Sequence, residues 1–271
     1  MDIFFYQLAL IGYIISMGGF FVSLFSPKPK IQQLSTFLFT GGFLAHTVGF
    51  ICNWVQLGHF PVIAMKGSIS FMAWLLALVY LILFFRFGLG VLGAFFNPLI
   101  LVLMFLSRII PGVTSPPRPI FRSLWLNLHI VFSLLGDALL AVAFCAGVIY
   151  LLQEKQIKQK KITEISGRLP SLSFLDTLNY HALIVGFIML TIGLVIGAVY
   201  AQWVRGSFWN WDAKEVWSVL TWLVYAILLH ERLAIGWRGR RAAWLSIIGF
   251  GFLIFTFLGV NYFLKTYHSF R

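Results

Sequence analysis

Long runs of apolar residues, separated by short stretches of polar or helix-breaking residues, follow one another along the whole chain. Each run is about as long as the roughly 20 residues that an α-helix needs to cross the hydrocarbon core of a bilayer. The pattern therefore predicts an all-α protein, a polytopic membrane helix bundle of about eight transmembrane helices. The expected spans are residues 4–25, 34–55, 68–86, 88–107, 126–152, 179–202, 216–234 and 243–264.

Helix-breaking residues mark several of the joints between these spans. They are Ser26-Pro27-Lys28-Pro29, the segment from Gly58 to Pro61, and the segment from Pro111 to Pro119. The joint at residues 85–88 is the weakest of the predicted boundaries, between the third and fourth spans. Because the apolar runs continue from end to end, we expect a single integral membrane domain over residues 1–271. The first run lacks a basic leading segment, which favours a span over a cleaved signal peptide.

The composition agrees with a membrane protein. Hydrophobic residues make up 60% of the chain and charged residues only 10%, whereas soluble domains carry about 25% charged residues. The two cysteines, Cys52 and Cys145, form no Cys-x-x-Cys motif, which excludes a thioredoxin-like dithiol and a zinc ribbon. Any thiols that the function requires must come from a substrate or a partner.

The positive charges indicate orientation rather than nucleic-acid binding. The formal net charge is +12, but the basic residues lie in short loops between apolar spans, where they set the orientation of a polytopic protein. Loops after the odd-numbered spans hold twelve of the twenty lysines and arginines. The bias is strongest at residues 153–178 and 232–242, which we expect on the cytoplasmic side. The loop at 203–215 then faces outward, and no nucleic-acid partner is expected.

Half of the ten tryptophans lie in or just after one predicted outer loop, at about residues 203–217, which we call the tryptophan loop. They are Trp203, Trp209, Trp211, Trp217 and Trp222. An interfacial aromatic belt would spread over many helices and both membrane faces, and this cluster does not. Indole rings offer stacking surface to a flat apolar ligand and N–H groups to its polar edge. A porphyrin fits that description, although these residues alone do not choose it over a quinone.

The charged residues of the tryptophan loop allow two roles each. Asp212 and Glu215 match a variant of the capping box, in which Asp212 caps the seventh span and Glu215 returns to the cap backbone. Arg205 and Lys214 could meet the propionates of a porphyrin or could simply be solvated. The sequence leaves both alternatives open.

The segment Gly206-Ser-Phe-Trp-Asn-Trp-Asp-Ala-Lys-Glu-Val-Trp-Ser218 resembles the "WWD" signature of the CcsA family, haem-handling proteins that attach haem to c-type cytochromes. The form typical of the family reads WGSYWxWDPKExWS. Arg205 and Ala213 depart from it, in place of the first tryptophan and the proline. The similarity is dense over residues 176–269 and looser over 40–85.

Six histidines are candidate haem ligands. His129, at the outer start of the fifth span, and His268, just past the outer end of the eighth, lie at the level of the tryptophan loop. The resemblance implies that this pair ligates one haem axially. His230 follows Val216 by fourteen residues, about 21 Å along a helix, which places it near the inner end of the seventh span. The resemblance implies that it holds a haem within the membrane, with a second ligand from a CcsB-type partner.

The remaining ionisable residues of the spans have weaker indications. His46 lies in the middle of the second span, where a polar group is costly, and is the internal fallback for the second ligand. His59 is expected in a loop before Pro61, and His181 at the membrane interface. Asp137 is an unusual acid inside the fifth span, for which we expect a polar contact within the bundle.

The resemblance implies a function: delivery of haem b and its thioether attachment to apocytochrome c on the outer side of the membrane. The chain would act as the CcsA subunit of a CcsBA-type holocytochrome c synthase in the bacterial plasma membrane, or alternatively the thylakoid membrane. The implied catalytic pair is His129 and His268. The implied haem-binding residues are His129, His268, His230, Trp203, Trp209, Trp211 and Asp212.

Three other classes of protein are possible. A haem transporter of the CcmC type would share the tryptophan loop but form no bond, although residues 220–244 look more like CcsA. A dihaem bundle of the cytochrome b type needs two helices, each with histidines thirteen or fourteen residues apart. Only His46 and His59 are so spaced, and Gly58 and Pro61 end their helix too early. No internal repeat is evident, which weighs against a secondary transporter.

Overall fold

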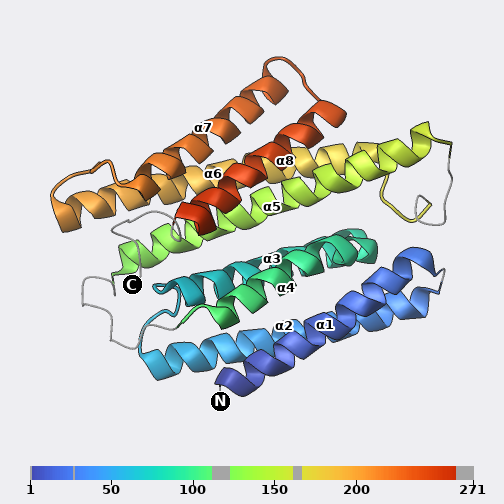
Figure 1. Cartoon of the computed structure of the whole chain (residues 1–271), viewed down its shortest axis with the longest axis horizontal. Helices are drawn as coiled ribbons and strands as arrows, with labels where there is room; N and C mark the ends of the chain where they lie inside the picture. The colour runs from blue at the N-terminus through green and yellow to red at the C-terminus, as the bar shows by residue number, and fades with distance from the viewer. Residues whose placement is uncertain (1, 27, 112–122, 161–166, 261–271) are drawn as a thin grey trace. The chain divides into compact units, whose positions relative to one another are not determined.

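The computed structural model describes residues 2–26, 28–111, 123–160 and 167–260. Within them, eight helices are long and apolar enough to cross a membrane, and none of these residues lies in a strand (Figure 1). The all-α fold and the eight predicted spans are therefore confirmed. The elements in chain order are α1 (Asp2–Phe25), α2 (Pro29–Leu57), α3 (Met65–Phe87), η1 (Gly90–Leu92), α4 (Gly93–Ile109), α5 (Leu124–Lys158), α6 (Leu172–Arg205), α7 (Ala213–Leu233), α8 (Arg240–Ile254) and the π-helical turn η3 (Phe255–Gly259).

The weakest predicted joint is a real boundary. Gly88 takes a left-handed backbone conformation, with φ of 69°, and its N–H donates to the carbonyl of Phe84 to end α3. Glycine adopts this conformation without the clash that a Cβ would cause. Gly58 ends α2 in the same way, with φ of 67°. Both turns depend on glycine rather than proline.

Several helices are longer than their apolar runs. The apolar run predicts residues 126–152 for the fifth span, but α5 continues to Lys158. Lys158 is salt-bridged to Glu154 one turn earlier, at 2.7 Å, a pair that supports an exposed helix end. Similarly, α6 begins at Leu172 rather than 179, capped by the Ser171 hydroxyl, which accepts from the N–H of Phe174. Hydrophobicity marks the bilayer-crossing part of a helix but not where its backbone ends.

The chain divides into two compact units, which we describe separately: residues 1–112 with 153–170, and residues 113–152 with 171–271. The single domain expected over 1–271 stays a prediction. In the first unit, α1 and α2 pack closely where Gly12 meets the backbone of Gly42. Buried aromatic rings, among them Phe20, Phe39 and Tyr80, fill the space beside them.

The second unit is held together by glycine contacts and buried polar bonds. Gly136 on α5 lies against the backbone of α6 at Leu190. Asn179 on α6 donates to the carbonyl of Ala143 on α5 and to the hydroxyl of Ser246 on α8, both at 2.8 Å. Small residues and interhelical hydrogen bonds are the means by which helices associate in a bilayer, where burial of apolar surface gives no driving force.

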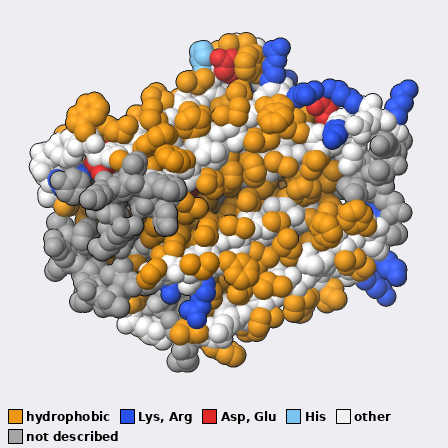
Figure 2. Space-filling model, viewed as in Figure 1, with side chains coloured by type: hydrophobic (Ala, Val, Ile, Leu, Met, Phe, Trp, Pro, Cys, Tyr) orange, Lys and Arg blue, Asp and Glu red, His pale blue; other side chains and the backbone are white. Residues whose placement is uncertain are grey.

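The described surface is largely apolar. Large hydrophobic side chains are exposed along many of the helices, and they cover wide areas of the face shown in Figure 2. A soluble protein rarely exposes apolar patches of this extent. The surface is therefore that of an integral membrane protein whose helices face lipid.

Candidate functional site

His129 is the predicted site residue whose orientation is best defined. It lies on α5, half-buried, and its Nδ1 is 2.7 Å from the carbonyl oxygen of Gly193 on α6. A carbonyl can only accept, so Nδ1 carries the proton, and the neutral ring then has its lone pair on Nε2. This tautomer is the one that binds a metal through Nε2, and such a bond on the other nitrogen usually orients the ring of a metal-ligating histidine.

Two glycines of α6 lie beside the His129 ring. A Cβ on Gly197 would lie 2.6 Å from both Nδ1 and Cε1 of His129, so no larger residue fits there without moving the ring. Gly193, one turn earlier, supplies the carbonyl. Together they form a Gly-x-x-x-Gly pair of the kind that brings two membrane helices close together. This spacing is visible in the sequence, but the sequence does not connect it with His129.

The tryptophan loop lies at the same end of α5 and α6 as His129. Trp125, one turn before His129, meets Trp203 near the end of α6 edge to face, with ring centroids 5.9 Å apart. The chain leaves α6 at Gly206, whose φ is 74°, and enters α7 at Ala213. The segment that is not helical, residues 206–212, is therefore shorter than the predicted loop. We call this end of the second unit the loop end.

Trp209 and Trp211 do not form a flat platform. Their rings meet edge to face, with centroids 5.6 Å apart and planes 84° apart. A flat ligand can therefore stack on the face of one ring while touching the edge of the other. Trp211 is 79% exposed and takes a left-handed conformation, with φ of 57°, which is unusual for a bulky residue. Trp203 is 70% exposed.

The other two tryptophans of the cluster pack between helices. Trp217 lies against Phe255, with ring centroids 4.5 Å apart. Trp222 stacks on Phe187 and donates its N–H to the hydroxyl of Thr191 at 2.9 Å. Both therefore join α7 to its neighbours.

The capping-box prediction is right in position and wrong in its hydrogen bonds. Asp212 is the N-cap residue of α7, but its side chain makes no capping hydrogen bond. Glu215 does reach back, to the N–H of Asn210 rather than to that of Asp212, at 2.8 Å, and it also forms a salt bridge with Arg205. Glu215 thus ties the end of α6 and the loop to the first turn of α7. Trp211 in its left-handed conformation turns the chain between Asn210 and the cap, and the N–H that donates to Glu215 is that of Asn210.

The acid inside α5 faces charge from the tryptophan loop. Asp137 interacts electrostatically with Lys214 of α7, and Lys214 also interacts with Asp212, which is itself buried. Tyr225 is fully buried near Asp137, and its hydroxyl has no hydrogen-bond partner among the described residues. The carboxylate of Asp137 and the ammonium of Lys214 therefore attract each other, and a direct polar contact of Asp137 stays a prediction. Lys214 is directed into the bundle, so it is poorly placed to meet a ligand's propionates from outside.

His230 lies at the opposite end of α7 from the loop. It is seventeen residues beyond Ala213, about 25 Å along the helix, and its side chain is exposed. The neighbouring Arg232 is buried, salt-bridged to Asp176 of α6 at 2.9 Å and placed over the ring of Tyr180. The N–H of Gly239 donates to the same aspartate at 2.8 Å. This network fixes the end of α7 that carries His230.

Both ring nitrogens of His46, in the first unit, face hydrogen-bonding groups. Nε2 is 3.0 Å from the hydroxyl of Ser70 and Nδ1 is 3.4 Å from that of Tyr13. The side chain is only 2% exposed. A role as haem ligand would require these bonds to break and the helices around His46 to open.

Of the remaining histidines, the structure describes His59 and His181 but not His268. His59 follows α2 and faces the carbonyl of Phe60, in the loop position expected for it. His181 is exposed on α6. His268 lies outside the described residues, so its pairing with His129 stays a prediction. Cys52 and Cys145 are not joined by a disulfide.

These features define a class: an eight-span helical membrane protein with a tryptophan-rich loop beside an oriented histidine. The comparisons with known proteins identify the family. The model of the cytochrome C assembly protein family matches residues 62–268. The chain belongs to that family.

Relatives named "Cytochrome c biogenesis protein CcsA" match over most of the chain. The protein of Chlamydomonas reinhardtii is 35% identical over 229 residues, which are 81% of this chain and 63% of that protein. The protein of Prochlorococcus marinus (strain MIT 9312) is 31% identical over 296 aligned positions, covering 100% of this chain and 93% of that protein. The chain thus spans less than two thirds of the algal relative and nearly all of the cyanobacterial one.

A solved structure shares the fold. The structure of "Cytochrome c Heme Lyase CcmF" superposes with a TM-score of 0.70 at 18% sequence identity, covering 99% of this chain and 47% of that protein. At this identity the likeness concerns the fold alone. The fold of the whole chain therefore resembles that of about half of a longer protein.

Proposed function

We propose that this chain is the CcsA subunit of a CcsBA-type cytochrome c synthase, which holds haem b at the loop end and positions it for attachment to apocytochrome c. The observation that carries the proposal is the bond from His129 Nδ1 to the carbonyl of Gly193, which fixes the ring against α6 beside the tryptophan loop and assigns the ring proton to Nδ1. Family membership and the names of the relatives support it.

In this proposal His129 and His268 ligate the haem iron from opposite sides, and Trp209 or Trp211 covers the porphyrin face. The salt bridge between Arg205 and Glu215 holds the loop between the ends of α6 and α7. Asp212, buried at the start of α7, contributes through its interaction with Lys214. Outer contacts of this kind set the orientation of metal ligands and tune their affinity.

The bond-forming step needs no redox partner. Each substrate thiol adds across a haem vinyl group: a sulfur–carbon bond forms, the vinyl double bond becomes single, and the thiol proton passes to the other vinyl carbon. The haem carries the reactive groups. The contribution of the chain is to hold two reactants in register, which makes the step effectively unimolecular.

Haem reaches the loop end, we propose, by way of His230. A separation of about 25 Å along α7 is too long for one haem to contact both His230 and the loop end. The His230 haem then needs a second ligand. His46 is buried and hydrogen-bonding at both nitrogens, which favours a histidine of the CcsB-type partner. The proposed location is the bacterial plasma membrane, with the thylakoid membrane as the alternative, and the tryptophan loop faces outward.

Reconstitution tests the function. The chain, a CcsB-type partner, haem b and an apocytochrome with a Cys-x-x-Cys-His segment are combined in reduced form, and haem that remains on the cytochrome in a denaturing gel is measured. The proposal predicts covalent haem that disappears when His129 is replaced by alanine. Haem binding without any covalent product would favour the CcmC-type carrier instead.

The orientation is tested separately. Single cysteines at position 158 and in residues 232–242, in a chain without Cys52 and Cys145, should react with a membrane-impermeant reagent only from the cytoplasmic side. Labelling of position 158 from outside would reverse the orientation and place the tryptophan loop on the wrong side for this function.

A further inference from the structure

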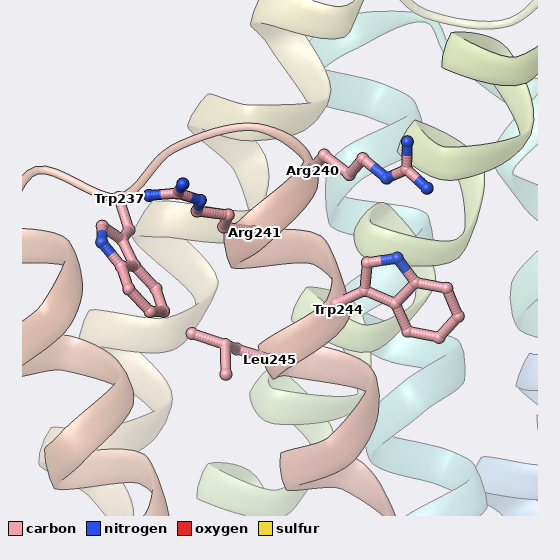
Figure 3. Close-up of a pocket in the computed structure, with 5 residues that line it drawn as sticks. All are labelled: Trp237, Arg240, Arg241, Trp244 and Leu245. Carbon is pink, nitrogen blue, oxygen red and sulfur yellow. The ribbon is translucent and has the colours of Figure 1, made fainter.

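The start of α8 carries a hollow that the proposed function does not use. It has a volume of about 470 Å³ and is open to its surroundings, and Figure 3 shows the five residues that line it. They are Trp237, Arg240, Arg241, Trp244 and Leu245. The guanidinium of Arg241 lies over the ring of Trp237, 5.2 Å from its centroid. Two cations and two indoles thus surround one mostly apolar surface.

The loop before α8 is fixed at both ends. The N–H of Trp237 donates to the carbonyl of Glu231 at 3.1 Å, which folds the loop back on the last turn of α7. The N–H of Gly239 is held by Asp176 at 2.8 Å. Asp176 is also paired with Arg232 at 2.9 Å, which ties the loop to α6 and to the last turn of α7.

An exposed apolar stripe continues from the hollow down α8. After Arg241, toward the C-terminus, the stripe consists of Trp244 (49% exposed), Ile248 (52%), Phe252 (37%) and Phe255 (37%). These residues are spaced by three or four positions, so they share one face of the helix. The N-terminal end of this face is basic and carries indole rings, and its C-terminal part is apolar. The helix beneath it is apolar and long enough to cross the bilayer.

We propose that this face is a binding site for an anionic phospholipid. The phosphate bonds the guanidinium of Arg241, since guanidinium groups match phosphate geometry. Arg240, whose side chain points to the other side of the helix start in Figure 3, adds positive charge nearby. Trp237 and Trp244 flank the headgroup at the interface, where tryptophan is favoured, and an acyl chain lies along Ile248 and Phe252. The cytoplasmic leaflet, on which the charge pattern places this loop, is the anionic one.

Haem is the rival ligand, because it also joins acidic groups to an apolar body. A porphyrin needs an open aromatic face, and Arg241 already lies over the ring of Trp237. The linear stripe on α8 suits an acyl chain rather than a plate. The lipid proposal does not depend on the proposed function.

Native mass spectrometry of the full chain tests the proposal. The protein is released from nanodiscs made with phosphatidylglycerol and phosphatidylcholine, and retained lipids are counted. We expect one tightly held phosphatidylglycerol. The Arg240→Gln/Arg241→Gln double variant should hold it about thirty-fold more weakly, because each basic residue at an anionic surface contributes about fivefold and the two effects multiply. Arg238→Gln removes a charge from the same loop but not from the hollow, and should retain the lipid.

The proposal fails if the double variant keeps the phosphatidylglycerol as the native chain does, or if Arg238→Gln loses it equally. It also fails if phosphatidylcholine is retained as tightly. Loss of bound haem from the double variant, with lipid retention unchanged, would assign the hollow to haem propionates. A Trp244→Leu variant, which keeps both charges, serves as a second test. It should weaken the retention of phosphatidylglycerol less than the double variant does.

Discussion

Replacing Gly197 with alanine tests whether His129 is held by α6 as the structure shows. The added Cβ would lie 2.6 Å from two atoms of the His129 ring, well inside an ordinary van der Waals contact. Either the ring or the helix must move by most of an ångström. Overpacking of this kind costs about 1–3 kcal/mol, and loss of the Nδ1 bond about 0.5–1.5 kcal/mol more. We expect the variant to accumulate in the membrane with His129 turned away from its ligating orientation.

The assay compares cytochrome c maturation, measured by covalent haem, with the absorption spectrum and thermal unfolding of the purified chain. Gly197→Ala should lose maturation and change the spectrum of haem bound at the loop end. Gly41→Ala is the matched control, because a Cβ there meets nothing within 4 Å and alanine stabilises a helix interior by up to about 1 kcal/mol. Normal maturation by Gly197→Ala would show that the ring does not need its place against α6, and would refute the reasoning.

Three further changes test other parts of the proposed site. Trp209→Ala and Trp211→Ala should lower the haem-to-protein ratio unequally, because only one of the two rings can present its face to a flat ligand. Stacking on that ring contributes about 0.5–1.5 kcal/mol. Equal losses in the two variants would contradict the edge-to-face arrangement. Asp137→Asn should lower the unfolding temperature by removing the carboxylate that attracts Lys214, and Lys214→Met should restore part of the loss; strictly additive effects would show that the two residues do not interact. His230→Ala should yield chain and partner nearly empty of haem, whereas His129→Ala should keep the haem held by His230. Full haem loading of the His230 variant would exclude the proposed route by way of His230.

The spans were predictable because each needs an apolar run of nearly fixed length, which a bilayer imposes on the sequence. The ends were not, since helices such as α5 continue through charged residues beyond the apolar run. Local pairs such as Glu154 and Lys158 stabilise those extensions, and hydropathy does not register them.

The site was predictable where a residue's role depends on its place along a span. The sequence put His129, the tryptophan loop and His230 at particular ends of particular helices, and the structure places His129 beside the loop and His230 far from it. It did not show the attraction between Asp137 and Lys214, or the bond from His129 to Gly193, because both join segments distant in sequence. The Gly-x-x-x-Gly spacing at residues 193–197 was the local sign of a close helix contact, but it did not identify His129 as the residue in that contact.

The most direct test of the central claim is the haem state of His129→Ala and His268→Ala in the complex with a CcsB-type partner. Each variant is purified, its absorption spectrum is recorded in the reduced and oxidised states, and its covalent product with apocytochrome c is measured. We expect both variants to accumulate normally and to keep the haem held by His230. They should show altered haem ligation at the loop end and form no thioether product. If both variants mature cytochrome c as the native chain does, these histidines are not the ligands and the proposed site is wrong.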